Sequence, residues 1–182
     1  MQKNKKKIKL HLGCGNVIIR EENVEWINID VQDIPGVDKV MGIYPLKIKS
    51  NSIDVVYSSS VLEHLEEDKL TVLKDWVRVL KPNGVLRVSV PDFSKAAELY
   101  LKEKDVDLIK GWVLGRADKR VHCHSILFDY KKLKGLMEEA GLEAIHYWDP
   151  RRQSHRDFFD MSQALTCDMQ MSLNLEGFKK IK

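Results

Sequence analysis

Two features near the N-terminus have the residue types and the spacing of a nucleoside-binding site. A Gly-Cys-Gly turn at 13–15 directly follows the alternating run 8–12, which predicts a strand that ends in a glycine turn. Glycine has no Cβ, so a ligand can approach such a turn closely. Asp30 ends a second predicted strand, 26–30, where a carboxylate can accept both ribose hydroxyls of a nucleoside.

The same turn lacks the pattern of a dinucleotide site. The G-x-G-x-x-G fingerprint requires a third glycine where this chain has Ile18. The segment between Cys14 and Trp26 also shows little helical patterning, so it offers no helix N-terminus for a pyrophosphate. A cofactor with a ribose and no pyrophosphate fits better, and nicotinamide-dependent oxidoreduction is disfavoured.

Two histidines in the second half of the chain, His122 and His124, precede a predicted helix. Histidine titrates near neutral pH and can remove a proton from a hydroxyl. We expect His124 to act as a general base, with His122 as the second candidate; a loop histidine without a catalytic role is the alternative for each. Two histidines with no clear third ligand do not make a metal site, so none is predicted.

Other charged residues could contact a substrate. Asp92 follows the predicted strand 85–90 directly. A later stretch combines arginine, histidine and aspartate: Arg151, Arg152, His155, Arg156 and Asp157. Guanidinium pairs bidentately with carboxylate or phosphate, so the arginines could recognise an acidic substrate group, and a solvated surface is the alternative.

Alternating strands and helices must position these residues. Apolar spacing predicts strands at 8–12, 26–30, 39–41, 53–57, 85–90, 143–148 and 171–178, and helices at 70–80, 94–104, 106–115 and 130–140. Such alternation is typical of an α/β fold with a mainly parallel sheet. Ligands of such sheets bind outside the carboxyl ends of the strands, which is where the residues above lie.

Length and composition set the class of protein. A chain of 182 residues suits a single domain, and 43% hydrophobic with 31% charged residues excludes general disorder. The three cysteines are widely spaced and form no CxxC pair, which fits a reducing compartment. No apolar segment follows the basic N-terminus and no run approaches the length of a membrane span. We therefore expect a cytoplasmic protein without a membrane span.

The net charge of +3 comes from one end of the chain. Residues 1–20 hold six of the 30 basic residues and no acidic residue, which leaves 24 basic against 27 acidic residues in the rest. Segment 1–7 precedes the first predicted strand, so we interpret it as a flexible, solvated basic tail. Nucleic acid is therefore disfavoured as a partner.

Residues 8–93 carry an ordered set of motifs. These are His11-Leu-Gly-Cys-Gly-Asn16, Trp26-Ile-Asn-Ile-Asp30, Pro45-Leu46 ahead of Asn51-Ser-Ile-Asp54, Ser58-Ser-Ser-Val-Leu-Glu-His64-Leu65, Leu80-Lys-Pro-Asn-Gly-Val-Leu86 and Val90-Pro-Asp92. In this combination the chain resembles the class I S-adenosylmethionine-dependent methyltransferases, closest to the methyltransferase type 11 group. Segments 129–148 and 172–176 resemble later elements of that family.

The resemblance implies a fold. It is a Rossmann-like α/β sheet of seven strands, mostly parallel with an antiparallel last strand and with helices on both faces, in a single domain over 1–182. The substrate pocket of such enzymes is made from inserted segments, which here correspond to 93–128 and 149–170.

The resemblance also implies S-adenosylmethionine as cofactor and a role for each residue that matches a motif. The turn at 13–15 wraps the methionine portion, Asp30 binds the ribose hydroxyls and Val31 packs on adenine. Residues expected to flank the rest of the cofactor are Gly42 and Ile43 at adenine, Ser58 and Ser59 at the sulfonium, and His64 nearby. His11, in the first of these motifs, is a further cofactor-binding candidate, although the family usually has an acid there. This motif also lacks the usual third glycine, and the first helix is shortened.

The implied reaction is methyl transfer, and we expect the acceptor to be an oxygen of a small molecule or of a glycan precursor. No Asn-Pro-Pro-Tyr type motif of amino-methylating nucleic-acid enzymes is present. The altered first motif supports an alternative, a catalytically silent S-adenosylmethionine-binding module that acts as a sensor or partner protein. The acceptor and the oligomeric state are not predicted by any motif.

Overall fold

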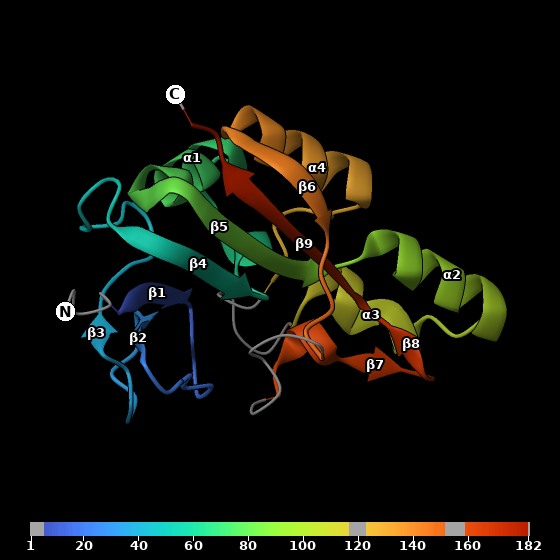
Figure 1. The fold of residues 1–182 in the computed structure, drawn as a ribbon. Helices are drawn as coiled ribbons and strands as arrows, with labels where there is room; N and C mark the ends of the chain where they lie inside the picture. The colour runs from blue at the N-terminus through green and yellow to red at the C-terminus, as the bar shows by residue number, and fades with distance from the viewer. Residues whose placement is uncertain (1–5, 117–122, 152–158, 182) are drawn as a thin grey trace.

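The computed structural model of the chain describes residues 6–116, 123–151 and 159–181 (Figure 1). A seven-stranded sheet in the order β3-β2-β1-β4-β5-β9-β6 forms its centre. The strands are β1 Lys7–Leu12, β2 Val24–Asp30, β3 Lys39–Val40, β4 Ile53–Ser59, β5 Leu80–Pro91, β6 Leu142–Tyr147 and β9 Ser172–Lys179. β9 runs antiparallel to β5 and β6, and the other neighbours are parallel, which confirms the predicted fold.

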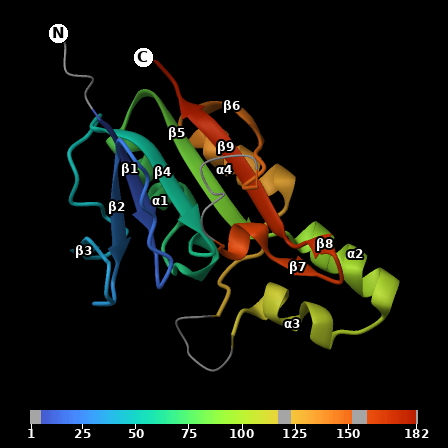
Figure 2. The same ribbon diagram turned by 60° about the horizontal axis from the view of Figure 1, so that its bottom comes forward.

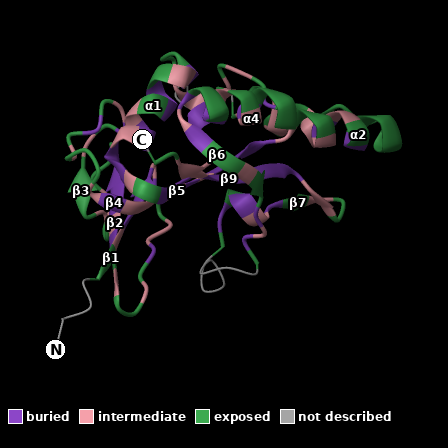
Figure 3. Cartoon of the chain, turned by 45° about the horizontal axis from the view of Figure 1, so that its top comes forward, coloured by how far each residue is buried: buried purple, intermediate pink, exposed green. Residues whose placement is uncertain are grey.

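Helices lie around this sheet. They are η1 Leu62–His64, α1 Lys69–Val79, α2 Phe93–Glu103, α3 Asp107–Leu114, α4 Tyr130–Glu139 and η4 Met161–Gln163, and a small hairpin joins β7 Leu165–Thr166 to β8 Met169–Gln170. Figure 3 shows α1 and α4 along one side of the sheet, and Figure 2 shows α2 and α3 beyond the carboxyl end of β5. Within the described residues, no helix is long and apolar enough to cross a membrane.

Alternation along the strands divides the sheet into two different faces. On one face, Leu10 of β1, Val56 of β4 and Leu86 of β5 are fully buried beneath α1. Trp76 and Leu73 of α1 complete this core, and each large apolar side chain buried there contributes roughly 1.5–3 kcal/mol. This face provides the rigid base for the loops at the carboxyl ends of the strands.

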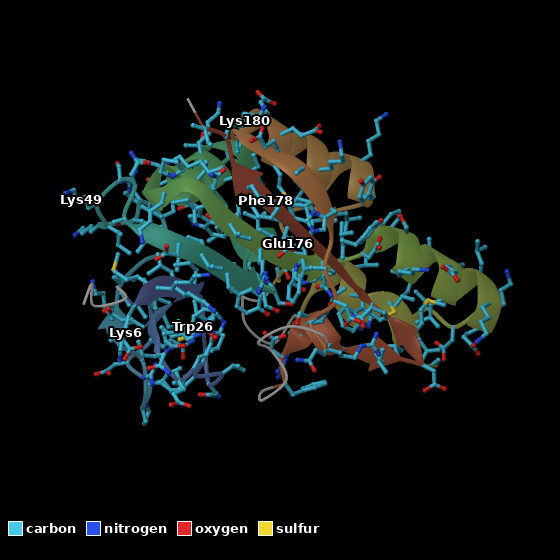
Figure 4. The ribbon with its side chains drawn as sticks, viewed as in Figure 1. Lys6, Trp26, Lys49, Glu176, Phe178 and Lys180 are labelled. Atoms are coloured by element: carbon cyan, nitrogen blue, oxygen red, sulfur yellow. The ribbon has the colours of Figure 1, made fainter. Side chains whose placement is uncertain are left out.

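The other face carries a row of mostly polar side chains across five strands. The strand register places His11, Tyr57, Arg87, Glu176 and His146 next to one another. His11 stacks on Tyr57 with ring centroids 5.1 Å apart, and Arg87 Nε donates to Glu176 Oε2 at 2.7 Å. Glu176 lies on β9, between β5 and the edge strand β6 (Figure 4). Turns, Trp148 and η4 cover this row, in place of helices such as α1 and α4.

The connections that precede the site residues are short. Described residues 13–23, between β1 and β2, and 31–38, between β2 and β3, form turns without a helix. The first helix, expected to be shortened, is therefore absent. β1 begins at Lys7, the last residue of the predicted basic tail, and residues 1–5 lie outside the described residues.

α1 ends one residue earlier than its apolar pattern predicts. Asp68 begins the helix, because its side chain accepts a hydrogen bond from the N–H of Thr71 at 2.8 Å. Leu80, the last member of the predicted stripe, is already extended and pairs with Ile53 as the start of β5. Pro82 cannot continue a helix, so the chain turns into the strand before it reaches the proline.

Candidate cofactor-binding site

A cavity of about 850 Å³ opens at the carboxyl ends of β1, β2 and β4. It is lined by Gly13, Asp30, Val31, Gln32, Ile43, Ser60, Val61, His64, Leu65, Glu66 and Glu67. Its volume falls in the range of small-molecule and cofactor sites. Five of the residues predicted to bind a cofactor lie in this lining: Gly13, Asp30, Val31, Ile43 and His64.

The carboxylate of Asp30 is fixed at the end of β2. Its Oδ2 accepts a hydrogen bond from the N–H of Gly15 at 2.8 Å, and its Oδ1 accepts one from the N–H of Gln32 at 2.9 Å. Each carboxylate oxygen has a second lone pair, so the group can still accept two hydroxyl donors. Two adjacent hydroxyls on a ribose are such donors.

Gly13 brings the turn after β1 against the segment that follows β4. Its φ of +67° lies in the left-handed region, and a Cβ there would come within 2.5 Å of Val61 Cγ2. Gly15 has a φ of +49°, and a Cβ there would meet no atom within 4 Å. The first glycine therefore closes the wall of the cavity, and the second leaves open space beside the Asp30 carboxylate.

The side of the cavity that is expected to face adenine is anchored to α1. Trp76 Nε1 donates to the carbonyl oxygen of Ile43 at 2.9 Å, and Asp75 Oδ2 accepts from the N–H of Leu46 at 2.6 Å. These bonds fix the loop between β3 and β4. Across the cavity, Val31 has 67% of its surface exposed, so an aromatic base lying on it would cover apolar surface.

Six other residues predicted to bind the cofactor lie beside the cavity and outside its lining: His11, Cys14, Gly15, Gly42, Ser58 and Ser59. His11 is buried in the polar row of the sheet, and its burial lowers the pKa of the imidazole to about 4 against the opposing effects of Asp160, Asn28 and Asp30. Burial raises the pKa of the Cys14 thiol to about 11, so the thiol stays protonated at neutral pH.

Six residues of the cavity lining were not predicted to bind the cofactor: Gln32, Ser60, Val61, Leu65, Glu66 and Glu67. β4 continues to Ser59, two residues beyond the predicted strand, so the turn that faces the cavity begins at Ser60, with a φ of +53°. Ser58 and Ser59 are thereby strand residues. The Ser58-to-Leu65 motif marked this stretch, but it did not indicate which of its side chains face the cavity.

The acceptor end of the cavity combines His64 with two neighbours, Glu63 and His124. The rings of His64 and His124 lie 4.9 Å apart between centroids, although the residues are 60 positions apart in the sequence. Burial lowers the pKa of His124, and the nearby His64 lowers it further. Burial raises the pKa of Glu63 to about 8, opposed in part by donors of its own backbone, Ser60 and Val61. This end of the cavity therefore has groups suited to proton transfer.

The remaining candidates are dispersed. Asp92 caps α2, since its Oδ1 accepts from the N–H of Ser94 at 2.9 Å, and it lines a separate cavity of about 310 Å³ together with Arg151. His122, Arg152, His155, Arg156 and Asp157 lie outside the described residues. The prediction that the arginines recognise an acidic group stays a prediction.

The residues present fit S-adenosylmethionine. The Asp30 carboxylate keeps lone pairs for ribose hydroxyls, the turn leaves open space beside Gly15, and Val31 exposes apolar surface that an aromatic base could cover. No phosphate-binding helix N-terminus adjoins this turn in the described segment 13–23.

Comparisons with known proteins agree with this geometry. Residues 10–88 match the family described as methyltransferase domain, type 11. No curated protein matches the chain by sequence.

Solved structures of methyltransferases share the fold. A SAM-dependent methyltransferase from Methanosarcina mazei is 16% identical with a TM-score of 0.61, over 98% of this chain and 95% of that one. A Thermotoga maritima SAM-dependent methyltransferase, described as a possible histamine N-methyltransferase, is 17% identical with a TM-score of 0.60, over 97% and 83%. One from Archaeoglobus fulgidus is 14% identical with a TM-score of 0.59, over 95% and 86%.

The seven-stranded sheet with its antiparallel β9, the glycine turn and acid at the ends of β1 and β2, and the family match over 10–88 agree with one another. S-adenosylmethionine is the cofactor that they indicate. Residues 10–88 match a methyltransferase-domain family model, and the sheet order is that of the class I methyltransferase fold.

Proposed function

We propose that this protein binds S-adenosylmethionine in the cavity at Asp30 and transfers its methyl group to an oxygen of a small molecule or of a glycan precursor. The observation that carries the proposal is the Asp30 carboxylate, which two backbone N–H groups hold at the edge of an 850 Å³ cavity. The cofactor supplies a methyl group on a positively charged sulfur. The task of the chain is to align an acceptor with it.

Different lining residues contact different parts of the cofactor. Asp30 accepts the ribose hydroxyls, Val31 and Ile43 enclose the adenine, and the backbone of the turn at 13–15 lies along the methionine portion. His64 then lies at the far end of the cavity, toward the acceptor. The roles that the family implies support this order, and Gly13, Asp30, Val31, Ile43 and His64 all line the cavity.

An oxygen acceptor is favoured by the groups at the far end. A hydroxyl must lose its proton as its oxygen bonds to the methyl carbon. Burial lowers the pKa of the half-buried His124, which favours the neutral imidazole that can take this proton. Glu63 lies beside it. These residues are our candidates for the general base.

Calorimetry with S-adenosylhomocysteine tests the cofactor site. Asp30→Ala removes a charged partner of two hydroxyl donors, each worth roughly 1.5–3 kcal/mol, so we expect binding to weaken by about 100-fold or more. Asp33→Ala is the matched control, because Asp33 is an exposed acid three residues along the chain and outside the cavity lining. Unchanged binding in Asp30→Ala, or no binding by the wild type, contradicts the assignment.

Transfer of a labelled methyl group to a panel of sugars and small hydroxylated acids tests the reaction. We expect labelled product with at least one hydroxyl acceptor, and its loss in His124→Ala while S-adenosylhomocysteine still binds. Tight cofactor binding without transfer to any member of a broad panel supports the alternative, a silent binding module.

A further inference from the structure

The acceptor end of the cavity holds a cluster of three ionisable side chains, which is more than proton transfer requires. Glu63, His64 and His124 each direct one nitrogen or oxygen atom into a common space, and these atoms all lie within 4.8 Å of one another. Two come from the short helix η1 after β4, and the third from the segment that follows residues 117–122. Two imidazoles and a carboxylate are a donor set that divalent transition metals prefer.

Backbone hydrogen bonds hold the two segments together. The N–H of Ser125 donates to the carbonyl oxygen of Glu63 at 2.8 Å, and its Oγ lies 2.6 Å from the carbonyl oxygen of Leu65. The N–H of His124 donates to the carbonyl oxygen of Leu114 at 3.1 Å. The three side chains are therefore brought together by contacts of the main chain on both sides of His124.

The orientation of His64 suits a ligand. Its Nδ1 lies 3.2 Å from the carbonyl oxygen of Cys123, which can only accept, so Nδ1 carries the proton. The lone pair is then on Nε2, which lies 3.8 Å from Glu63 Oε1. Histidines that bind metals commonly donate their second N–H to a backbone carbonyl in this way, which fixes the ring.

The other two side chains have polar atoms that the described protein leaves unsatisfied. Glu63 is 1% exposed, and no donor of the described residues is in hydrogen-bond geometry with either carboxylate oxygen, although Ser60 and the backbone of Val61 lie near enough to lower its pKa. Nδ1 of His124 is also buried without a partner there. Burying polar atoms without partners is unfavourable, and more so for a charged group. A cation between them would pair with the Glu63 carboxylate and with a nitrogen of each histidine.

We propose that Glu63, His64 and His124 bind one divalent transition-metal ion, of the Zn²⁺ class, at the acceptor end of the cavity. Tetrahedral Zn²⁺ places its ligand atoms roughly 3.4 Å apart, so the three side chains close on the ion by about 1.4 Å at most. Three protein ligands leave a coordination position open, as in catalytic metal sites. His64 also lines the cofactor cavity, so the open position lies toward the bound substrates.

The ion gives the acceptor end a second way to activate a hydroxyl, and this role rests on the function proposed above. A hydroxyl bound at the open position has a lowered pKa and releases its proton to solvent. Its oxygen then bonds to the methyl carbon, while the bond from that carbon to sulfur breaks and its electron pair stays on sulfur. In the metal-bound protein, His124 is a ligand, and it is free to act as a base only in the metal-free protein.

Metal binding is tested without substrate. The full chain is treated with a chelator, dialysed, and titrated with Zn²⁺ by calorimetry; Co²⁺ is then added and its visible spectrum recorded. We expect one ion per chain and a tetrahedral or five-coordinate Co²⁺ spectrum. Glu63→Gln and His124→Ala should each weaken binding by about 100-fold or more, because each removes one of three ligands.

Two controls exclude other sites. His146→Ala removes a histidine of the polar row and should bind Zn²⁺ as the wild type does. Cys123→Ser removes the nearest exposed thiol and should leave the spectrum unchanged. Circular dichroism of the metal-free variants shows whether they fold. If Glu63→Gln does not fold, His124→Ala still tests the proposal, because this variant leaves the buried Glu63 carboxylate in place.

Wild-type protein that binds neither Zn²⁺ nor Co²⁺, or variants at positions 63 and 124 that bind like wild type, overturns the proposal. S-adenosylhomocysteine binding is measured separately on the metal-free protein. If the protein binds the metal but not S-adenosylhomocysteine, the proposed function is contradicted and the metal site is not. If it binds S-adenosylhomocysteine but not the metal, only the metal site is contradicted.

Discussion

The two ends of the cavity are built in different ways. At the cofactor end, Asp30 and Gly13 follow adjacent parallel strands, and the Asp30 carboxylate is satisfied by neighbouring backbone. At the acceptor end, Glu63 and His124 come from distant segments and keep buried polar atoms without described partners. The Asp30 carboxylate is thus held by the folded chain itself, while the acceptor end leaves a buried carboxylate and an imidazole nitrogen for a ligand to satisfy, as proposed above.

The difference has a physical origin. A site at the ends of neighbouring strands is set by the sheet register, so short motifs are sufficient to build it. The acceptor end depends on where the segment around His124 folds back, and it is held by a few hydrogen bonds to η1. Substitutions should therefore affect the two ends separately.

The largest effect, and one confined to the cofactor end, should come from Gly13→Ala. The new Cβ meets Val61 within 2.5 Å and the backbone has a φ of +67°, so we expect a loss of stability of about 2–4 kcal/mol. S-adenosylhomocysteine binding should fall with it. Urea unfolding measures the change. Gly15→Ala is the matched control. Its new Cβ meets no neighbouring atom, so only the backbone is strained, and the loss of stability should be about half that of Gly13→Ala.

A smaller effect should follow from the titration of His11, next to the cofactor end. Burial lowers the pKa of His11 from 6.5 to about 4, so the unfolded chain takes up a proton before the folded one as the pH falls. The contribution of His11 to the free energy of unfolding is fully present above pH 6.5, and it declines by about 3 kcal/mol as the pH falls to 4. The charges of Asp160 and Asp30 limit the shift.

Urea unfolding of wild type and His11→Phe at pH 7 and pH 4.5 measures this effect. Phenylalanine keeps an aromatic ring against Tyr57 and removes the titrating group. The variant should lose less stability than the wild type between the two pH values. Equal losses would show that His11 does not contribute to the acid sensitivity.

The smallest effect should come from Ser125→Ala at the acceptor end. The substitution removes the hydroxyl that lies within 2.9 Å of two carbonyl oxygens, those of Glu63 and Leu65, and should cost about 1 kcal/mol of stability. Binding of S-adenosylhomocysteine should not change, whereas Zn²⁺ affinity should fall about 10-fold. If cofactor binding weakens as much as metal binding, the two ends are coupled and the comparison fails.

Sequence patterns were sufficient for the sheet and for much of the cofactor end. Strand periodicity located the ends of β1 and β2, and with them Gly13 and Asp30. It did not identify Glu63 as a site residue, because a carboxylate in a Leu-Glu-His run has no distinguishing pattern until its burial is known. The pairing of His64 with His124 depends on tertiary contacts across 60 residues, which local patterns do not encode.

The polar row on the second face of the sheet also affects how the protein responds to temperature. A parallel sheet usually buries apolar side chains on both faces. Here Arg87 and Glu176 form an ion pair on one of them, with Arg87 over the ring of Trp148. Exposing polar surface lowers the heat capacity of unfolding, whereas exposing apolar surface raises it. The curve of stability against temperature should therefore be flatter than for a sheet of the same size with two apolar faces.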